Sequence, residues 1–188
     1  MRILVVTVTW LLVQSLHAED WTHWRGPTQN GVSFDKNLPD KWTPQGENVL
    51  WKAAVGSRSA PVVSRGKVYL IGSVNPDQVT EQERVACLDA ETGKLLWEHR
   101  FNVFMTDIVT NRVGWAVPCA DAETGYVYTH GTQGLLTCFS EDGKIVWQHS
   151  LTEEYGRVSG YGGRTSSPTV IDDLVIIHMV QSSWGDNG

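Results

Sequence analysis

The feature of this sequence that most restricts its fold is an internal repeat. The stretch LDAETGKLLW at residues 88–97 returns in altered form as FSEDGKIVW at residues 139–147. Both copies turn through a Gly-Lys pair and then reach two aliphatic residues and a tryptophan, and Trp51 closes a related stretch, NVLW. Tryptophans 51, 97 and 147 are 46 and 50 residues apart. A chain with such self-similarity builds the same structural unit more than once.

The prolines indicate the order of the strands within the repeated unit. Pro61, Pro118 and Pro168 lie in SAPVV, AVPCA and SSPTV, and each is followed by a turn and a second apolar strand. In the first two units a third strand, RVACLDA or GLLTCFS, comes next, and then the Gly-Lys turn and a fourth strand with the tryptophan. His99 and His149 also match, each two residues past its tryptophan. We therefore assign these histidines to the architecture of the repeat.

A period of roughly 40 to 50 residues with four strands per unit is typical of β-propeller blades. One four-stranded sheet cannot bury both of its faces, whereas blades stacked around an axis bury them against each other. The sequence therefore predicts an all-β fold, a partial β-propeller of about two and a half four-stranded blades, with an all-β sandwich as the alternative. The first blade is expected at 57–101, the second at 115–151 and a half blade at 164–188.

The repeated glycines, tryptophans and cysteines have expected roles in such blades. Gly93 and Gly143 supply the positive φ that the turn before the fourth strand needs. The tryptophan rings are expected to pack between adjacent sheets, where each N–H needs a partner. The cysteines have no metal-binding spacing, and equivalent positions of neighbouring blades lie too far apart for a disulfide. We predict that the three cysteines are small buried residues: Cys87, Cys119 and Cys138.

The first 18 residues have the pattern of a secretory signal peptide. A positively charged start precedes an apolar run of 11 residues, and QSLHA then ends on Ala18. The run is shorter than the roughly 20 residues that span a bilayer, so we expect no transmembrane span and a periplasmic or secreted protein. Cleavage after Ser15 and a buried N-terminal strand of a cytosolic protein are the alternatives. Residues 19–56 would form an N-terminal segment that leads into the blades and could supply the strand that closes the ring.

Composition and motifs exclude several classes of function. The chain has 15 Lys+Arg against 21 Asp+Glu and no basic run, so nucleic-acid binding has no electrostatic basis. The histidines show no metal-ligand spacing, and no G-x-S-x-G, H-E-x-x-H or C-x-x-C occurs. The acidic groups at 89–91, 121–123, 153–154 and 172–173 are all predicted to fall in turns. We therefore predict no catalytic and no metal-binding residues.

The repeat also carries a family resemblance. CLDAETGKLLW resembles the tryptophan-docking repeat of pyrroloquinoline-quinone (PQQ) propellers, A-x-D-x-x-T-G-K-x-x-W, with Cys87 in place of the alanine. The second copy keeps Gly143, Lys144 and Trp147, and the opening WTHWRGPTQNGVS is similar to the start of secreted bacterial PQQ-like propeller proteins. The resemblance implies a PQQ-like β-propeller over nearly everything after the first 18 residues. The family includes quinoprotein dehydrogenases and an outer-membrane assembly scaffold, so the resemblance implies a fold more than an activity.

Ligands of propellers usually bind at the axis, where the innermost strands and their loops converge. The strands that follow the prolines are expected to be innermost, and Arg58, Trp115 and Arg164 come just before them. An arginine could pair with a carboxylate-bearing cofactor such as PQQ, and a tryptophan could stack on its flat rings. Solvated loop residues and ordinary packing are the alternative. PQQ with calcium is implied by the resemblance alone, because no calcium ligands or adjacent cysteines can be matched.

Two functions follow from this reading. The first is an exported, non-catalytic scaffold or binding module that takes a protein partner or a small ligand at the propeller axis. The alternative is the N-terminal part of a PQQ-dependent alcohol or sugar dehydrogenase whose catalytic residues lie beyond residue 188. A closed ring needs about seven or eight blades in this family, so the chain is expected either to be a piece of a longer protein or to self-associate through its open blade face.

Overall fold

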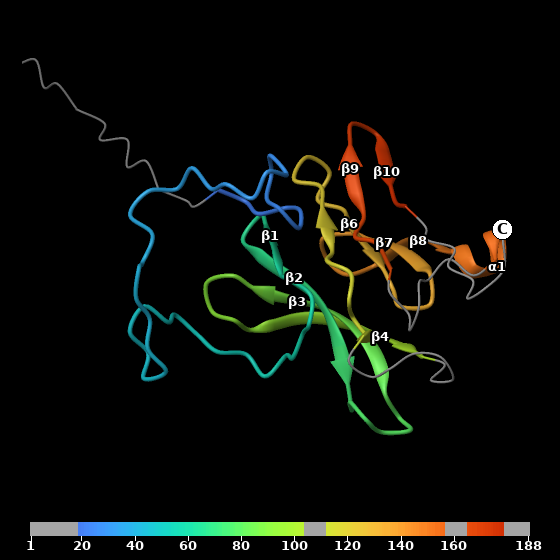
Figure 1. The fold of residues 1–188 in the computed structure, drawn as a ribbon, viewed down its shortest axis with the longest axis horizontal. Helices are drawn as coiled ribbons and strands as arrows, with labels where there is room; N and C mark the ends of the chain where they lie inside the picture. The colour runs from blue at the N-terminus through green and yellow to red at the C-terminus, as the bar shows by residue number, and fades with distance from the viewer. Residues whose placement is uncertain (1–18, 104–111, 157–164, 179–188) are drawn as a thin grey trace, which may run out of the picture.

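The computed structural model describes residues 19–103, 112–156 and 165–178. Within these residues, two four-stranded antiparallel sheets and a two-stranded hairpin follow one another along the chain (Figure 1). In each sheet the spatial order of the strands follows their order in the chain, as in a propeller blade. The prediction of an all-β fold built from propeller blades is therefore confirmed. The strands of blade 1 are β1 (Val62–Ser64), β2 (Lys67–Val74), β3 (Gln82–Asp89) and β4 (Leu95–Asn102), those of blade 2 are β5 (Cys119–Ala120), β6 (Val127–His130), β7 (Leu135–Phe139) and β8 (Ile145–Ser150), and those of the third hairpin are β9 (Thr169–Ile171) and β10 (Leu174–Ile176).

The first strand of each unit begins directly after one of the three prolines. Proline has no N–H to give to a ladder, so the start of a strand is one of the few places in a sheet that tolerates it. The first strands of successive units contact one another, β1 with β5 and β5 with β9. These contacts place the first strands of the three units next to one another.

The turns between strands follow from local chemistry, and one five-residue sequence shows this clearly. DAETG occurs between β3 and β4 at 89–93 and between β5 and β6 at 121–125. In both copies the glycine N–H donates to the aspartate carbonyl at 2.9 Å, and the threonine hydroxyl donates to the aspartate carboxylate. The hydrogen bonds from Thr92 hold the pKa of Asp89 below its usual value. The same five-residue sequence therefore forms the same turn at two different places in a blade.

The main core lies between the two blades rather than inside either of them. Tyr69, Val85 and Cys87 face it from blade 1, and Val127 and Phe139 face it from blade 2. The central part of β2 is buried on both faces, because a second cluster covers its other side. Stacking of blades therefore supplies the burial that a single four-stranded sheet cannot obtain alone.

One prediction about the acidic pairs was wrong. Glu153 and Glu154 do not lie in a turn but in the short helix α1 (Leu151–Tyr155), which follows β8. Acidic residues in the first helical turn interact favourably with the helix dipole. Leu151 is buried in a cluster with Leu136 of blade 2, which holds the start of the helix against the sheet.

The N-terminal segment runs outside the sheets for most of its length (Figure 1), but its first residues bind the blades. We call residues 20–23 the strap. The Asp20 carboxylate accepts a hydrogen bond from the Arg65 N–H at 2.9 Å. Trp21 and Val63 exchange backbone hydrogen bonds of 2.8 and 2.9 Å, so the strap pairs with β1.

The second half of the strap binds the other two units. The Thr22 carbonyl accepts a hydrogen bond from the Ala120 N–H of β5 at 2.9 Å. The His23 Nε2 accepts one from the Val170 N–H of β9 at 3.4 Å. Four consecutive residues therefore connect the first strands of three units, which lie far apart in the sequence.

Candidate functional site

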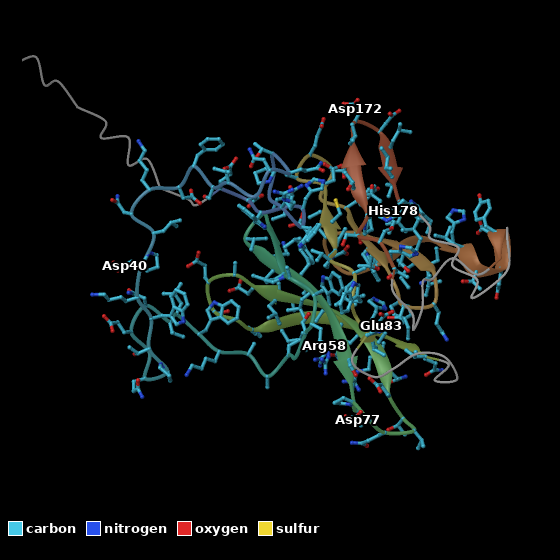
Figure 2. All side chains as sticks on the ribbon, viewed as in Figure 1. Asp40, Arg58, Asp77, Glu83, Asp172 and His178 are labelled. Carbon is cyan, nitrogen blue, oxygen red and sulfur yellow. The ribbon has the colours of Figure 1, made fainter. Side chains whose placement is uncertain are left out.

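The predicted ligand residues lie on loops that lead into first strands. Arg58 and Trp115 are both exposed, and each stands three residues before the proline of its blade. Figure 2 labels Arg58. Arg164 lies outside the described residues. Two of the three predicted residues can therefore be placed, on equivalent loops of neighbouring blades.

A buried acid that the sequence analysis missed lies between the blades. Glu83 on β3 is 5% exposed. Its Oε1 accepts hydrogen bonds from the Gly114 N–H at 2.9 Å, the Thr132 N–H at 3.1 Å and the Thr132 hydroxyl at 2.5 Å. Among the described residues no salt bridge reaches it, and burial raises the pKa of Glu83 even though these donors lower it. Glu83 thus ties blade 1 to the loops of blade 2.

The sequence contained a signal for this acid. Side chains two residues apart in a strand face the same side of the sheet. Glu83 is therefore in phase with Val85 and Cys87, which face the core between the blades. A charged residue in phase with buried apolar residues predicts a buried polar contact.

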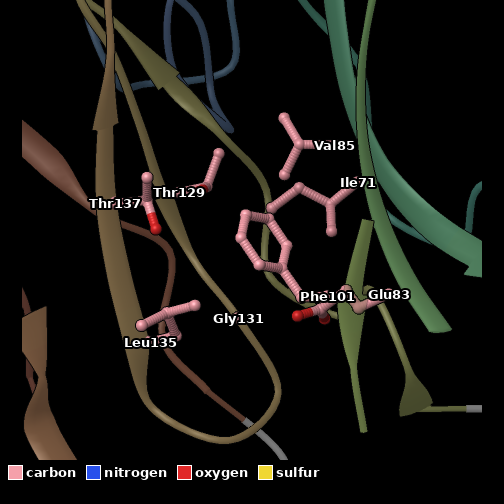
Figure 3. A pocket seen from close by; sticks show the side chains of 8 residues that line it. All are labelled: Ile71, Glu83, Val85, Phe101, Thr129, Gly131, Leu135 and Thr137. Atoms are coloured by element: carbon pink, nitrogen blue, oxygen red, sulfur yellow. The ribbon is translucent and has the colours of Figure 1, made fainter. Parts of the chain in front are cut away.

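A small cavity lies beside Glu83 (Figure 3). It holds about 10 Å³ of free space, which is room for roughly one water molecule. Glu83, Thr129 and Thr137 give it polar walls, and Ile71 and Phe101 are among its apolar walls. Such a cavity is too small for a flat organic cofactor, so this junction does not fit PQQ.

The contact between the blades is built around an aromatic cluster. The Trp97 ring lies 5.4 Å from the Phe139 ring of blade 2 and 6.0 Å from the Tyr69 ring of its own blade, measured between centroids. The Trp97 Nε1–H donates to the Glu141 carbonyl at 3.2 Å. A Cβ added at Gly143, whose φ is 84°, would lie 2.6 Å from the Trp97 ring, so only glycine fits there. The expected packing of Trp97 between adjacent sheets, with a partner for its N–H, is thus observed.

Trp51 meets blade 1 in the way that Trp97 meets blade 2. Its Nε1–H donates to the Ala90 carbonyl at 2.8 Å, and a Cβ at Gly93 would lie 2.5 Å from its ring. Trp51 lies outside the described strands, in the N-terminal segment. Residues around Trp51 therefore occupy the place that the fourth strand of a preceding blade would take.

The three cysteines are free and buried, as predicted. Burial raises the pKa of Cys87 and of Cys119 to about 12, and that of Cys138 to about 11. A thiol is nucleophilic only as the thiolate. At neutral pH these three side chains therefore act as small core residues.

His130 connects blade 2 to the third hairpin. It lies at the end of β6, and its Nδ1 donates to the Ser166 carbonyl at 3.0 Å. The His130 carbonyl accepts a hydrogen bond from the Thr165 hydroxyl at 3.1 Å. Burial lowers the pKa of His130, so the folded protein favours the neutral ring.

We expect this histidine to make stability depend on pH. Because its pKa is lowered by folding, the stability from neutral His130 is present above the unfolded pKa of about 6.5 and lost as pH falls below it. His23, whose pKa burial also lowers, acts in the same direction. His130→Gln should make the change in melting temperature from pH 7 to pH 5 less negative than it is in wild type, and this comparison cancels the opposite contribution of Glu83. His149→Gln replaces an exposed histidine and should leave the pH dependence of the melting temperature as it is in wild type. Equal pH profiles for wild type and His130→Gln would contradict the assignment.

Two further findings concern metals and membranes. In residues 19–103, 112–156 and 165–178, no group of three or more His, Cys, Asp or Glu side chains is arranged to hold a metal ion. The same residues contain no helix that is long and apolar enough to cross a membrane.

Two four-stranded antiparallel blades and a third hairpin, joined through glycine turns and inserted tryptophans, define a PQQ-like β-propeller repeat protein. A family model described as outer membrane protein assembly factor BamB matches residues 81–187, more than half of the chain. The chain belongs to this family of PQQ-like repeat proteins.

One solved structure illustrates the similarity. The crystal structure of BamB from Moraxella catarrhalis has 19% sequence identity and a TM-score of 0.43, over 69% of this chain and 33% of that one. The present chain thus covers about a third of that protein. None of the curated proteins matches the chain.

Proposed function

We propose that this chain is an exported propeller module that acts as a non-catalytic scaffold or binding module for a protein partner. The proposal places it in the periplasm or outside the cell, after removal of residues 1–18. The family model carries the description of an outer membrane protein assembly factor, whose role is exerted on other proteins. A shared fold does not fix a function, so the support for the proposal comes from the surface of this chain.

The observation that carries it is an aliphatic pair repeated on the outer strands. Leu95 and Leu96 on β4, and Ile145 and Val146 on β8, are all 42–45% exposed. Both pairs lie where the ladder to the preceding strand changes register, between Cys87 and Leu88 and at the equivalent place in blade 2. A β-bulge leaves one residue unpaired and is found at sheet edges. Exposed apolar groups that recur from blade to blade suit an extended protein-binding surface.

We further propose that the segment around Trp51 is the fourth strand of the blade that closes the ring. Trp51 docks on blade 1 through the same contacts that join blades 1 and 2. The other strands of that closing blade would come from further repeats of a longer chain or from a second copy. This assignment gives residues 19–56 a role in the ring and residues 57–188 the role of repeats.

The scaffold proposal is tested with a photo-crosslinking residue placed at Leu96 or at Val146 in the exported protein. A discrete crosslinked partner is expected from both positions. A probe at Glu123, an exposed residue of the β5–β6 turn, serves as the control and should give none. The double change Leu96→Ser and Val146→Ser should weaken co-purification of the same partner. Crosslinks from Glu123 alone, or from none of the three positions, would reject this surface.

The dehydrogenase alternative has a separate test. PQQ with calcium is titrated into the mature chain, with Trp115→Ala and Arg58→Ala as matched variants. Under the scaffold proposal no saturable uptake is expected. Saturable uptake that either variant abolishes would instead support the N-terminal part of a PQQ-dependent oxidoreductase with its ligand at the propeller axis.

A further inference from the structure

The third hairpin contributes few buried groups to its contact with the other units. No residue of β9 or β10 is buried, and Ile171, Leu174 and Ile176 are 46–60% exposed. Ile177, just after β10, packs against the cluster that contains Leu136. A two-stranded hairpin by itself is marginally stable in water. Polar contacts with the strap and with blade 2 therefore contribute a large part of what keeps this hairpin docked.

One of these polar contacts comes from the strap. The Val170 N–H of β9 donates to His23 Nε2 at 3.4 Å, and His23 Nδ1 lies 2.8 Å from Thr22 Oγ1. Because Nε2 accepts, the neutral ring carries its proton on Nδ1, where Thr22 Oγ1 accepts it. A protonated ring has an N–H on both nitrogens. Its Nε2–H would face the Val170 N–H, and the contact would be lost.

Further polar contacts come from β6. The Nδ1–H of His130 donates to the Ser166 carbonyl at 3.0 Å, and the His130 carbonyl accepts the Thr165 hydroxyl at 3.1 Å. The lone pair of the neutral ring is therefore on Nε2. Among the described residues this buried nitrogen has no hydrogen-bond partner. Protonation would place an N–H there without an acceptor among these residues, and a buried donor without a partner is costly.

The surroundings of the two rings favour their neutral form. Burial lowers the pKa of both His23 and His130. Asp121, in the β5–β6 turn, opposes this effect at His23, whereas His178, just after β10, adds to it at His130. The Cys119 thiol of β5 lies beside the same backbone N–H as His23, and burial raises its pKa to about 12, so it carries no charge there. Protonation of the two rings is therefore unfavourable while the hairpin stays docked.

We propose that His23 and His130 form a pH-sensitive latch: protonation of the two rings releases the third hairpin from the strap and from blade 2, while blades 1 and 2 stay folded. The aromatic cluster and the Glu83 hydrogen bonds still join the blades, and neither histidine contributes to them. This inference is independent of the proposed scaffold role, because it concerns only how the third unit is attached.

The direction of the pKa changes sets the pH window of the latch. In the released state the rings are exposed, with an ordinary pKa of about 6.5, and docking lowers that pKa. Docking is therefore strongest above about pH 6.5 and weakens as the pH falls below that value. It is weakest once the pH is below the pKa of the docked rings. The hairpin should be attached at neutral pH and largely released in mild acid.

Hydrogen exchange with mass spectrometry tests this release in the full chain, at about pH 7.5 and about pH 5. Each rate is divided by that of the unfolded chain at the same pH, which removes the intrinsic pH dependence of exchange. The protection of residues 165–178 should fall by about tenfold or more in acid, because loss of one hydrogen bond changes an equilibrium by up to about tenfold. Peptides from β2–β3 and β6–β7 should keep their protection. Unchanged protection of residues 165–178, or a parallel loss in all three peptides, would overturn the latch.

Two substitutions separate the histidines from other effects of acid. His23→Gln offers an oxygen that accepts the Val170 N–H without titrating. His130→Gln likewise offers an amide N–H to the Ser166 carbonyl. The double variant should lose most of the acid-induced fall in protection, whereas His149→Gln, which replaces an exposed histidine of β8, should behave like wild type. An undiminished fall in the double variant would overturn the assignment to these two rings.

A probe in the wild-type chain applies even if the double variant does not dock its hairpin. The buried Cys119 thiol lies beside the Val170 N–H of β9, so the docked hairpin covers it. A pyridyl disulfide reagent reacts with thiols in acid as well as at neutral pH. Relative to the unfolded chain, Cys119 should be labelled faster in acid by the same factor as the exchange, while Cys87 and Cys138 stay protected. Equal labelling of all three thiols, or no acid-induced labelling of Cys119, would overturn the latch.

Discussion

Replacing Trp97 with alanine is expected to lower the free energy of unfolding by about 3–5 kcal/mol, as large aromatic deletions in cores do. The Trp97 ring fills the space between the Tyr69 ring and the Phe139 ring and covers Gly143. Because Gly143 cannot move into the space without losing its turn, the cavity would collapse only partly. The substitution also leaves the Glu141 carbonyl without the indole N–H that it accepts.

Urea unfolding of the mature chain, followed by circular dichroism, measures this change. Trp42→Ala is the matched control, because Trp42 is 73% exposed. Its substitution should alter the free energy of unfolding by no more than about 0.5 kcal/mol. A loss below about 1 kcal/mol for Trp97→Ala would mean that Trp97 does not hold the blades together.

Glu83→Ala is expected to destabilise the protein by about 2–4 kcal/mol. The change leaves the Gly114 N–H and the Thr132 N–H without the carboxylate that accepts them. A buried donor without a partner costs about 1–3 kcal/mol, and the removal of a buried acid offsets part of that cost. Glu83→Gln keeps the shape of the side chain and one acceptor oxygen. Its loss of free energy of unfolding should therefore be less than half the loss caused by Glu83→Ala. Equal losses for the two variants would show that the hydrogen bonds of Glu83 do not hold the junction.

Wild type and Glu83→Gln together also test the protonation of Glu83. Its pKa is raised by burial, so the folded protein binds this proton more tightly than the unfolded chain does. The stability that protonated Glu83 contributes is fully present below its unfolded pKa of about 4.3 and is lost as pH rises through the folded pKa. The stability of wild type relative to Glu83→Gln should therefore decrease from pH 4 to pH 8. A difference that does not change with pH would contradict the raised pKa.

Several features of the blades could be predicted because they depend on neighbours in the chain. The DAETG turn needs only its own aspartate, threonine and glycine, and it forms twice in different surroundings. The positive φ of Gly93 and Gly143 and the packing of Trp97 between adjacent sheets could be predicted because each unit repeats a glycine turn followed by a tryptophan. The burial of Cys87 and Cys138 was predicted because their spacing suits neither a metal site nor a disulfide.

Other features depended on contacts that no local pattern records. Glu153 and Glu154 lie in a helix because Leu151 packs on Leu136, and a five-residue helix carries too little periodicity to be predicted. Glu83 is buried because the loops of blade 2, which follow it by about 30 and 50 residues, bring their N–H groups to it. Arg58 and Trp115 were chosen by position, and both side chains are exposed.

The sequence by itself determined the repeat unit: the length of a blade, its four strands, its glycine turns and the tryptophan that enters the next sheet. These properties follow from short-range periodicity and from the φ angles that glycine allows. Only the tertiary structure decided how the units are joined. The strap binds β1 and β5 through its own backbone and β9 through the His23 ring, and in all three strands the partner is a backbone group of the kind that every residue except proline carries. Side-chain patterns therefore could not reveal which distant strands those groups would reach.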